Sequence, residues 1–82
     1  MPTQTILDPA SLGRVIRDTR RALGVTQSDL ALSVGVGVRF VVDIEKGKLT
    51  AQIGKAMQVL AALGIVMQVV VPDRPGSGHG GA

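Results

Sequence analysis

Apolar residues recur at helical spacing in successive segments of the chain, and each segment is bounded by residues that start or stop helices. The first predicted helix covers 9–23, with Asp8 as its cap and proline at its first position. Its inward stripe is Leu12, Val15, Ile16, Thr19 and Leu23. A shorter helix is predicted over 27–34, because Thr26 begins a sequence resembling a capping box and Gly35 stops the apolar pattern.

Two further helices follow in the same way. Gly37 can precede a third helix over 38–46. Thr50 is a capping residue for a fourth helix over 51–63, and Gly64 marks its end. The expected inward residues are Val41 and Ile44 in the third helix, and Ile53, Ala56 or Met57, Leu60 and Leu63 in the fourth. The pattern thus predicts a mostly α-helical domain over 9–64, preceded by an N-terminal arm over 1–8.

The helical pattern ends at a short apolar run that predicts a β-strand covered on both faces. The strand comprises Ile65, Val66, Met67, Gln68, Val69, Val70 and Val71. A lone strand exposes unpaired backbone groups, so it needs a partner. Within the chain only residues 3–7 could pair with it, whereas a second copy could pair its own strand about a two-fold axis. We favour the second copy, because a homodimer also adds the burial that a small core lacks, and a buried fifth helical turn is the weaker alternative.

Composition narrows the possible functions. The chain has 82 residues, no cysteine and one histidine, His79, in a segment over 72–82 whose composition predicts a disordered tail. These counts exclude disulfides and any multi-histidine metal site, so neither an enzyme nor a cofactor is expected. No apolar run is long enough to span a bilayer and the N-terminus lacks a signal-peptide pattern, so we expect a soluble cytoplasmic protein.

The two shorter helices have the layout of a helix-turn-helix. The helices over 27–34 and 38–46 are joined by Gly35, Val36 and Gly37, a spacing that would place the second of them in a DNA major groove. The same spacing also occurs in purely structural helix pairs. The net charge of +3 is only weak support for an anionic partner.

Three stretches of the sequence match a known pattern of residues. They are Leu12-Gly13-Arg14-Val15-Ile16-Arg17, Leu23-Gly24-Val25-Thr26-Gln27-Ser28-Asp29-Leu30-Ala31 and Ile44-Glu45-Lys46-Gly47-Lys48. These stretches resemble the helix-turn-helix of the Cro and phage-repressor (XRE) superfamily. With Lys48-Leu49-Thr50-Ala51-Gln52-Ile53-Gly54-Lys55 and the strand that follows, the chain over 9–71 is similar to the HipB-like antitoxins. That resemblance implies a homodimeric repressor that binds double-stranded operator DNA and a HipA-type kinase toxin.

The start of the third helix supplies the candidates for base contacts. Gly37, Val38 and Arg39 occupy the positions nearest to base edges, with Val42 and Asp43 one turn later. Arg39 is the strongest candidate, because a guanidinium can donate to guanine O6 and N7 together, and a phosphate contact is its alternative role. Val38 replaces the polar residue usual in the family but could contact a thymine methyl group. Asp43 could accept from cytosine N4 or orient Arg39.

Other residues are candidates for phosphate contacts. Gln27 matches the glutamine that binds a DNA phosphate in the resembled repressors, and Ser28 lies beside it at a helix N-terminus. An ordinary solvent-facing helix start is the alternative for Gln27. Lys46, Lys48 and Lys55 could reach the flanking backbone, although such lysines often only face solvent.

Arg20 lies on the apolar edge of the first helix, where a charge needs a partner. The resemblance implies that its partner is Glu45, near the end of the third helix. An alternative function remains open at this point: a protein-interaction module that keeps the helix-turn-helix as a scaffold and positions a partner enzyme without binding specific DNA. Val38, Asp43 and the small net charge keep that alternative open.

Overall fold

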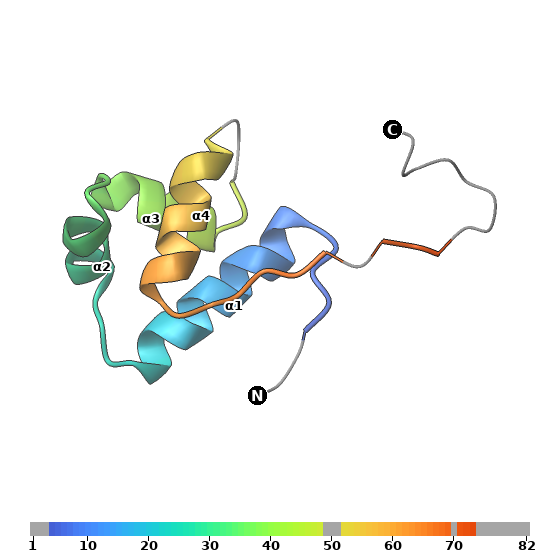
Figure 1. Cartoon of the computed structure of the whole chain (residues 1–82). Coiled ribbons are helices and arrows are strands. Elements are labelled where there is room, and N and C mark those ends of the chain that lie inside the picture. Colours follow the sequence, from blue (N-terminus) through green and yellow to red (C-terminus); the bar gives the residue numbers. More distant parts are fainter. Residues whose placement is uncertain (1–3, 49–51, 70, 74–82) are drawn as a thin grey trace.

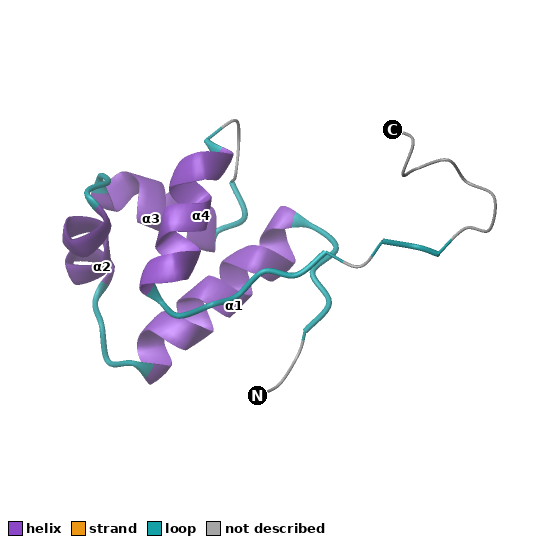
Figure 2. Ribbon diagram, in the orientation of Figure 1, coloured by secondary structure: helices purple, strands orange, loops and turns teal. Residues whose placement is uncertain are grey.

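The computed structural model describes residues 4–48, 52–69 and 71–73, and the four predicted helices are present within them. They are α1 (Pro9–Ala22), α2 (Gln27–Val34), α3 (Val38–Glu45) and α4 (Ile53–Ala62). Figure 1 shows them packed together, and Figure 2 shows the chain leaving the end of α4 as an extended segment. In the described part of the chain, no helix has both the length and the apolar character needed to cross a membrane.

The first two helix starts are capped as the sequence predicts. The Asp8 carboxylate accepts a 2.7 Å hydrogen bond from the backbone N–H of Ser11 and so caps α1. This hydrogen bond holds the pKa of Asp8 below its usual value. At α2, the Thr26 hydroxyl accepts from the backbone N–H of Asp29 at 3.0 Å. Gly35 ends α2 with φ of 84°, a conformation that favours glycine.

Four predicted helix limits are wrong by one or two residues. Leu23, Lys46 and Leu63 are the C-caps of α1, α3 and α4 and not their last helical residues. The fourth helix begins at Ile53, because Gln52 has φ of −99° and ψ of 56°, which is not helical. The N-cap of α4 is Gln52, so the prediction that Thr50 caps this helix is wrong. Thr50 and the predicted first residue Ala51 themselves lie outside the described residues.

One continuous apolar core lies between the helices. It consists of Leu12, Ile16, Leu30, Ala31, Val41, Ile44, Ala56, Val59, Leu60 and Leu63. Both inward residues predicted for the third helix are confirmed, and Phe40 packs at the core edge. The predicted inward positions of Leu23 and Ile53 are wrong, since their exposed fractions are 57% and 53%.

The inward face of α4 differs from the predicted stripe because small residues carry it. Ala56 and Val59 are fully buried, whereas Met57 is half exposed. The buried face packs against α2, and an alanine there permits a closer approach than a methionine would. Hydrophobic spacing alone left Ala56 and Met57 as alternatives, and packing selects Ala56.

Gly13 in α1 lies directly against the backbone of α3. A Cβ atom added to Gly13 would lie 2.5 Å from the carbonyl oxygen of Ile44 and 2.6 Å from that of Glu45. Side chains do not tolerate such distances to backbone atoms. Gly13 therefore sets the distance between the first helix and the end of α3.

The predicted C-terminal strand is absent from the described residues. Residues 65–69 and 71–73 have no regular secondary structure, and residue 70 lies outside the described part. No backbone hydrogen bond between described residues joins residues 4–7 to this segment, so the pairing within the chain is not formed there. A strand requires a hydrogen-bonded neighbour, and no other described residue supplies one to this segment.

Candidate nucleic-acid interface

The exposed face of α3 carries the residues expected to contact bases. Gly37 is the N-cap of α3, and it connects through Val36 to the end of α2. The Arg39 side chain is 81% exposed and Val38 is 45% exposed. Val42 and Asp43 are half buried one turn further along. The structure thus gathers all five predicted base-contact residues at the outer surface of one helix.

Arg39 and Asp43 form an ion pair along this face. Arg39 Nε lies 3.4 Å from Asp43 Oδ1, across one helical turn. Of the two roles predicted for Asp43, this geometry agrees with orienting Arg39. The Arg39 side chain is nevertheless 81% exposed, so its guanidinium is accessible to a ligand. The terminal nitrogens of a guanidinium are the donors that a guanine edge requires.

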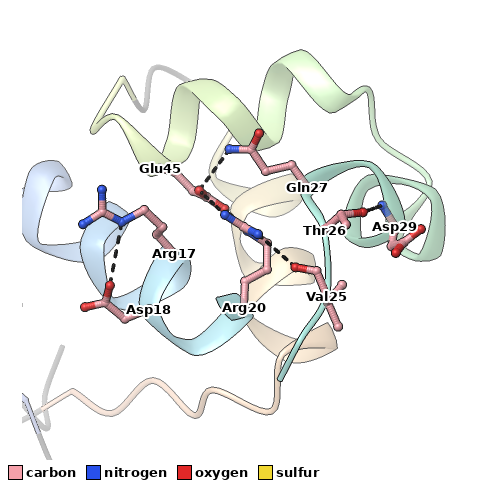
Figure 3. A network of polar contacts seen from close by, with 8 residues as sticks. All are labelled: Arg17, Asp18, Arg20, Val25, Thr26, Gln27, Asp29 and Glu45. Carbon is pink, nitrogen blue, oxygen red and sulfur yellow. Dashed lines mark hydrogen bonds and ion pairs between the residues drawn. The ribbon is translucent and has the colours of Figure 1, made fainter. Parts of the chain in front are cut away.

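The predicted ion pair between Arg20 and Glu45 is confirmed. Arg20 Nε donates to Glu45 Oε2 at 2.6 Å and Arg20 Nη2 donates to Oε1 at 3.1 Å, which makes the contact bidentate (Figure 3). The Glu45 carboxylate raises the pKa of Arg20, although burial acts in the opposite direction. Arg20 Nη1 donates to the Val25 carbonyl at 2.9 Å. The pair therefore ties α1 and the turn before α2 to the end of α3.

Gln27 belongs to the same network, a connection that no sequence pattern indicates. Its Nε2 donates to Glu45 Oε1 at 3.1 Å, and the residue is half buried (Figure 3). The alternative of a simple solvent-facing residue is therefore wrong. An amide nitrogen carries two hydrogens, so one remains for a second acceptor. Glu45 thereby orients the first side chain of α2 as well as Arg20.

The other predicted phosphate-contact residues divide into two groups. Ser28 is exposed in the first turn of α2, and Lys46 is exposed at the C-cap of α3 near Gln27. Lys48 is exposed in the chain after α3, and Lys55 is exposed on α4. Among the residues that the structure describes, no contact joins these two lysines to the Gln27 network. Only Ser28 and Lys46 lie beside it.

The described residues contain no group of three or more His, Cys, Asp and Glu side chains that could hold a metal ion. The single histidine, His79, lies outside the described part. The arrangement on α2 and α3 instead offers hydrogen-bond donors at an exposed surface: the Arg39 guanidinium, the second Gln27 N–H and the free N–H groups at the start of α2. Such donors suit a nucleic-acid backbone and base edges.

Comparison with known proteins agrees with this geometry. An uncharacterised HTH-type transcriptional regulator of Sinorhizobium fredii, y4mF, is 46% identical over 67 residues, which are 82% of this chain and 88% of that protein. Among solved structures, HipB in the HipA–HipB–O2–O3 complex has a TM-score of 0.77 at 22% identity, covering 87% of this chain and all of that one. The restriction-modification controller protein C.AhdI of Aeromonas hydrophila has a TM-score of 0.64 at 27% identity, covering 72% and 86%.

The helix-turn-helix family HTH_3 matches residues 16–66. This range begins in α1, includes α2, α3 and α4, and ends just after α4. It contains the buried ion pair and every predicted base-contact residue. The chain therefore belongs to the XRE-type helix-turn-helix family of transcriptional regulators.

Proposed function

We propose that the protein is a sequence-specific repressor that binds its own operator as a homodimer through α3. The observation that carries this proposal is the exposed Arg39 on a helix whose far end is fixed by a buried bidentate ion pair. A recognition helix must hold its side chains in one orientation to distinguish base pairs. The Arg20–Glu45 pair fixes the orientation of α3, and the Arg39–Asp43 pair orients the guanidinium of Arg39.

A gel shift with the purified wild-type chain tests this proposal. The probes are a duplex from the region upstream of its own gene and a mixed-sequence duplex of equal length, each at two salt concentrations. We expect steep loss of affinity with salt and a retained preference for the upstream duplex. Equal, weak binding to both probes would instead support the scaffold alternative, in which the chain positions a partner enzyme. The partial neutralisation of Arg39 by Asp43 is the feature that favours that alternative.

Replacing Arg39 with Ala should lower affinity for the upstream duplex by about 1 to 3 kcal/mol, because a bidentate contact to guanine is lost. Affinity for the mixed duplex should change much less. Arg14→Ala is the matched control, since Arg14 is also exposed and its removal changes the net charge equally. Fluorescence anisotropy with both probes measures the four affinities. If Arg39→Ala weakens both probes equally, the side chain contacts phosphate and does not read a base.

The homodimer is proposed to form through residues 65–71. The exposed fractions are 79% for Val66, 85% for Val69 and 68% for Val71. Apolar side chains left so exposed in one chain are typical of a surface that a partner covers. Pairing this segment with that of a second copy would also satisfy the backbone groups that have no strand neighbour here.

Replacing Val69 with Asp should convert the dimer to a monomer, because two carboxylates would meet near the two-fold axis. The control is Leu32→Asp, since Leu32 on α2 is 83% exposed. Its replacement should destabilise a single chain about as little as Val69→Asp does. Sedimentation equilibrium of wild type and both variants gives the mass. The proposed interface is wrong if wild type is monomeric at the concentrations that bind DNA, or if Val69→Asp remains dimeric.

We further propose that the protein is an antitoxin that complexes a HipA-like kinase. The fold of HipB in its complex with HipA, O2 and O3 covers almost the whole of this chain, which supports the assignment. Co-expression with the product of the adjacent gene and co-purification of the two tests it. A stable complex with a kinase-like protein is the expected result. A neighbouring gene that encodes no such protein would leave a repressor that acts alone.

A further inference from the structure

Helix α3 carries a restricted set of side chains. It consists of Val38, Arg39, Phe40, Val41, Val42, Asp43, Ile44 and Glu45, so none of its side chains has a hydroxyl or an amide group. The helix is packed through half of these residues, since Val41, Ile44 and Glu45 are buried and Phe40 lies at the core edge. The outer surface of α3 is therefore made of two valines, one arginine and one aspartate.

These four outer side chains form two rows along the helix. Arg39 and Asp43 make the first row, one helical turn apart, and are joined by their ion pair. Val38 and Val42 have the same spacing and make the second row. Val38 is 45% exposed and Val42 is half buried. The surface thus offers one guanidinium, one carboxylate and, beside them, a short apolar row.

This set limits the base edges that α3 can recognise. Guanine O6 and N7 both accept from a guanidinium, so Arg39 suits a G·C pair. Adenine needs a side chain that donates to N7 and also accepts from N6, which asparagine and glutamine do. No side chain of α3 combines these two functions. Gln27 carries an amide, but it begins α2 and already donates to Glu45. The adenine edge therefore lacks a bidentate partner on α3.

The thymine edge differs because it carries a C5-methyl group in the major groove. An apolar side chain that covers this methyl group removes it from water, which is favourable. We propose that Val38 and Val42 contact thymine methyl groups, so that α3 recognises A·T pairs from the thymine side and G·C pairs through Arg39. The inference rests on the proposed operator binding and specifies the operator: a half-site in which thymines lie next to a guanine.

Base analogues that each remove one group from the major groove test this inference. Uracil lacks only the methyl group of thymine, and 7-deazaadenine lacks the N7 acceptor of adenine. Fluorescence anisotropy measures the affinity of wild type for the upstream duplex with thymine replaced by uracil, with adenine replaced by 7-deazaadenine, and unmodified. The mixed duplex with the same replacements accounts for changes in DNA shape. We expect uracil to weaken binding at least about fourfold, as for one methyl group left in water, and 7-deazaadenine to leave it unchanged.

A variant assigns the effect to the apolar row. Val38→Ala removes two methyl groups from that row, so it should weaken binding to the unmodified upstream duplex and reduce the difference between thymine and uracil. Leu32→Ala is the matched control, because Leu32 is 83% exposed on α2, outside the row. The control should retain both the affinity and the difference. Thermal unfolding midpoints close to that of wild type confirm that both variants fold.

The possible outcomes separate this inference from the proposed function. If wild type prefers the upstream duplex but binds its uracil form equally well, the methyl contacts are overturned and the repressor proposal stands. The same holds if 7-deazaadenine weakens binding as much as uracil does, or if uracil weakens wild type and Val38→Ala equally. If wild type shows no preference for the upstream duplex, both proposals fail.

Discussion

Replacing Glu45 with Ala is expected to lower the free energy of unfolding by about 3 to 5 kcal/mol. The exposed fractions of the Arg20 and Glu45 side chains are 10% and 4%, so the variant would leave a buried guanidinium without its carboxylate. Gln27 would lose its acceptor at the same time. Since small domains are stable by only about 5 to 15 kcal/mol, this single change removes a large part of the total. Urea denaturation followed by circular dichroism measures the loss.

A double variant separates the destabilisation caused by an unpaired buried charge from the stabilisation that the ion pair contributes. Arg20→Leu together with Glu45→Leu removes both charges, so its stability should lie much closer to wild type than that of Glu45→Ala. Its operator affinity should nevertheless fall, because nothing then fixes the end of α3 or orients Gln27. If Arg20→Leu alone retains both stability and operator affinity, the pair has no structural role.

Replacing Gly13 with Ala is expected to destabilise the fold by about 1 to 3 kcal/mol, despite the higher helix propensity of alanine. The added Cβ would lie 2.5 Å from the Ile44 carbonyl oxygen, and backbone cannot move aside as a flexible side chain can. Helices α1 and α3 would have to separate, which would also strain the Arg20–Glu45 contact between them. Thermal unfolding of the variant measures the effect.

Gly54→Ala is the matched control for this substitution. Gly54 lies in the first turn of α4, and a Cβ atom there would have no neighbour within 4 Å. The same chemical change should therefore raise stability by about 0.4 to 1 kcal/mol, because it reduces the freedom of the unfolded chain. Equal shifts for the two variants would show that the close approach at Gly13 is not a constraint.

The sequence predicts the helices well because local signals decide where each one starts and stops. Asp8 and Thr26 cap their helices as expected, and Gly35 ends α2 in a conformation that favours glycine. The Arg20–Glu45 pair was implied by family resemblance, and a charge on an apolar helix edge gave an independent reason to seek a partner.

Features that depend on tertiary contacts could not be predicted in the same way. The burial of Ala56 in place of Met57 depends on how closely α4 approaches α2, and spacing allows either residue. The link from Gln27 to Glu45 joins two helices over 18 positions, and no local pattern indicates it. A strand over 65–71 needs a hydrogen-bonded neighbour, and the described residues supply none, so the apolar pattern of this segment alone could not determine its conformation.

The placement of positive charge shows the same limit. No local pattern relates Arg17 and Arg21 in α1 to Lys46 at the end of α3, yet all three line one open groove between these helices. Only the folded arrangement of α1 against α3 brings the three cations around one concavity. A net charge of +3 gives little information until its placement is known.

Dimethyl sulfate protection at guanine N7 tests most directly whether α3 contacts bases in the major groove as part of a homodimer. N7 faces the major groove, so a guanine in contact with α3 should be shielded. On the upstream duplex we predict two protected patches separated by about one helical turn, roughly 34 Å, with protection lost in Arg39→Ala. A bound complex in which guanine N7 remains fully reactive, or in which Arg39→Ala leaves the protection unchanged, would contradict the account.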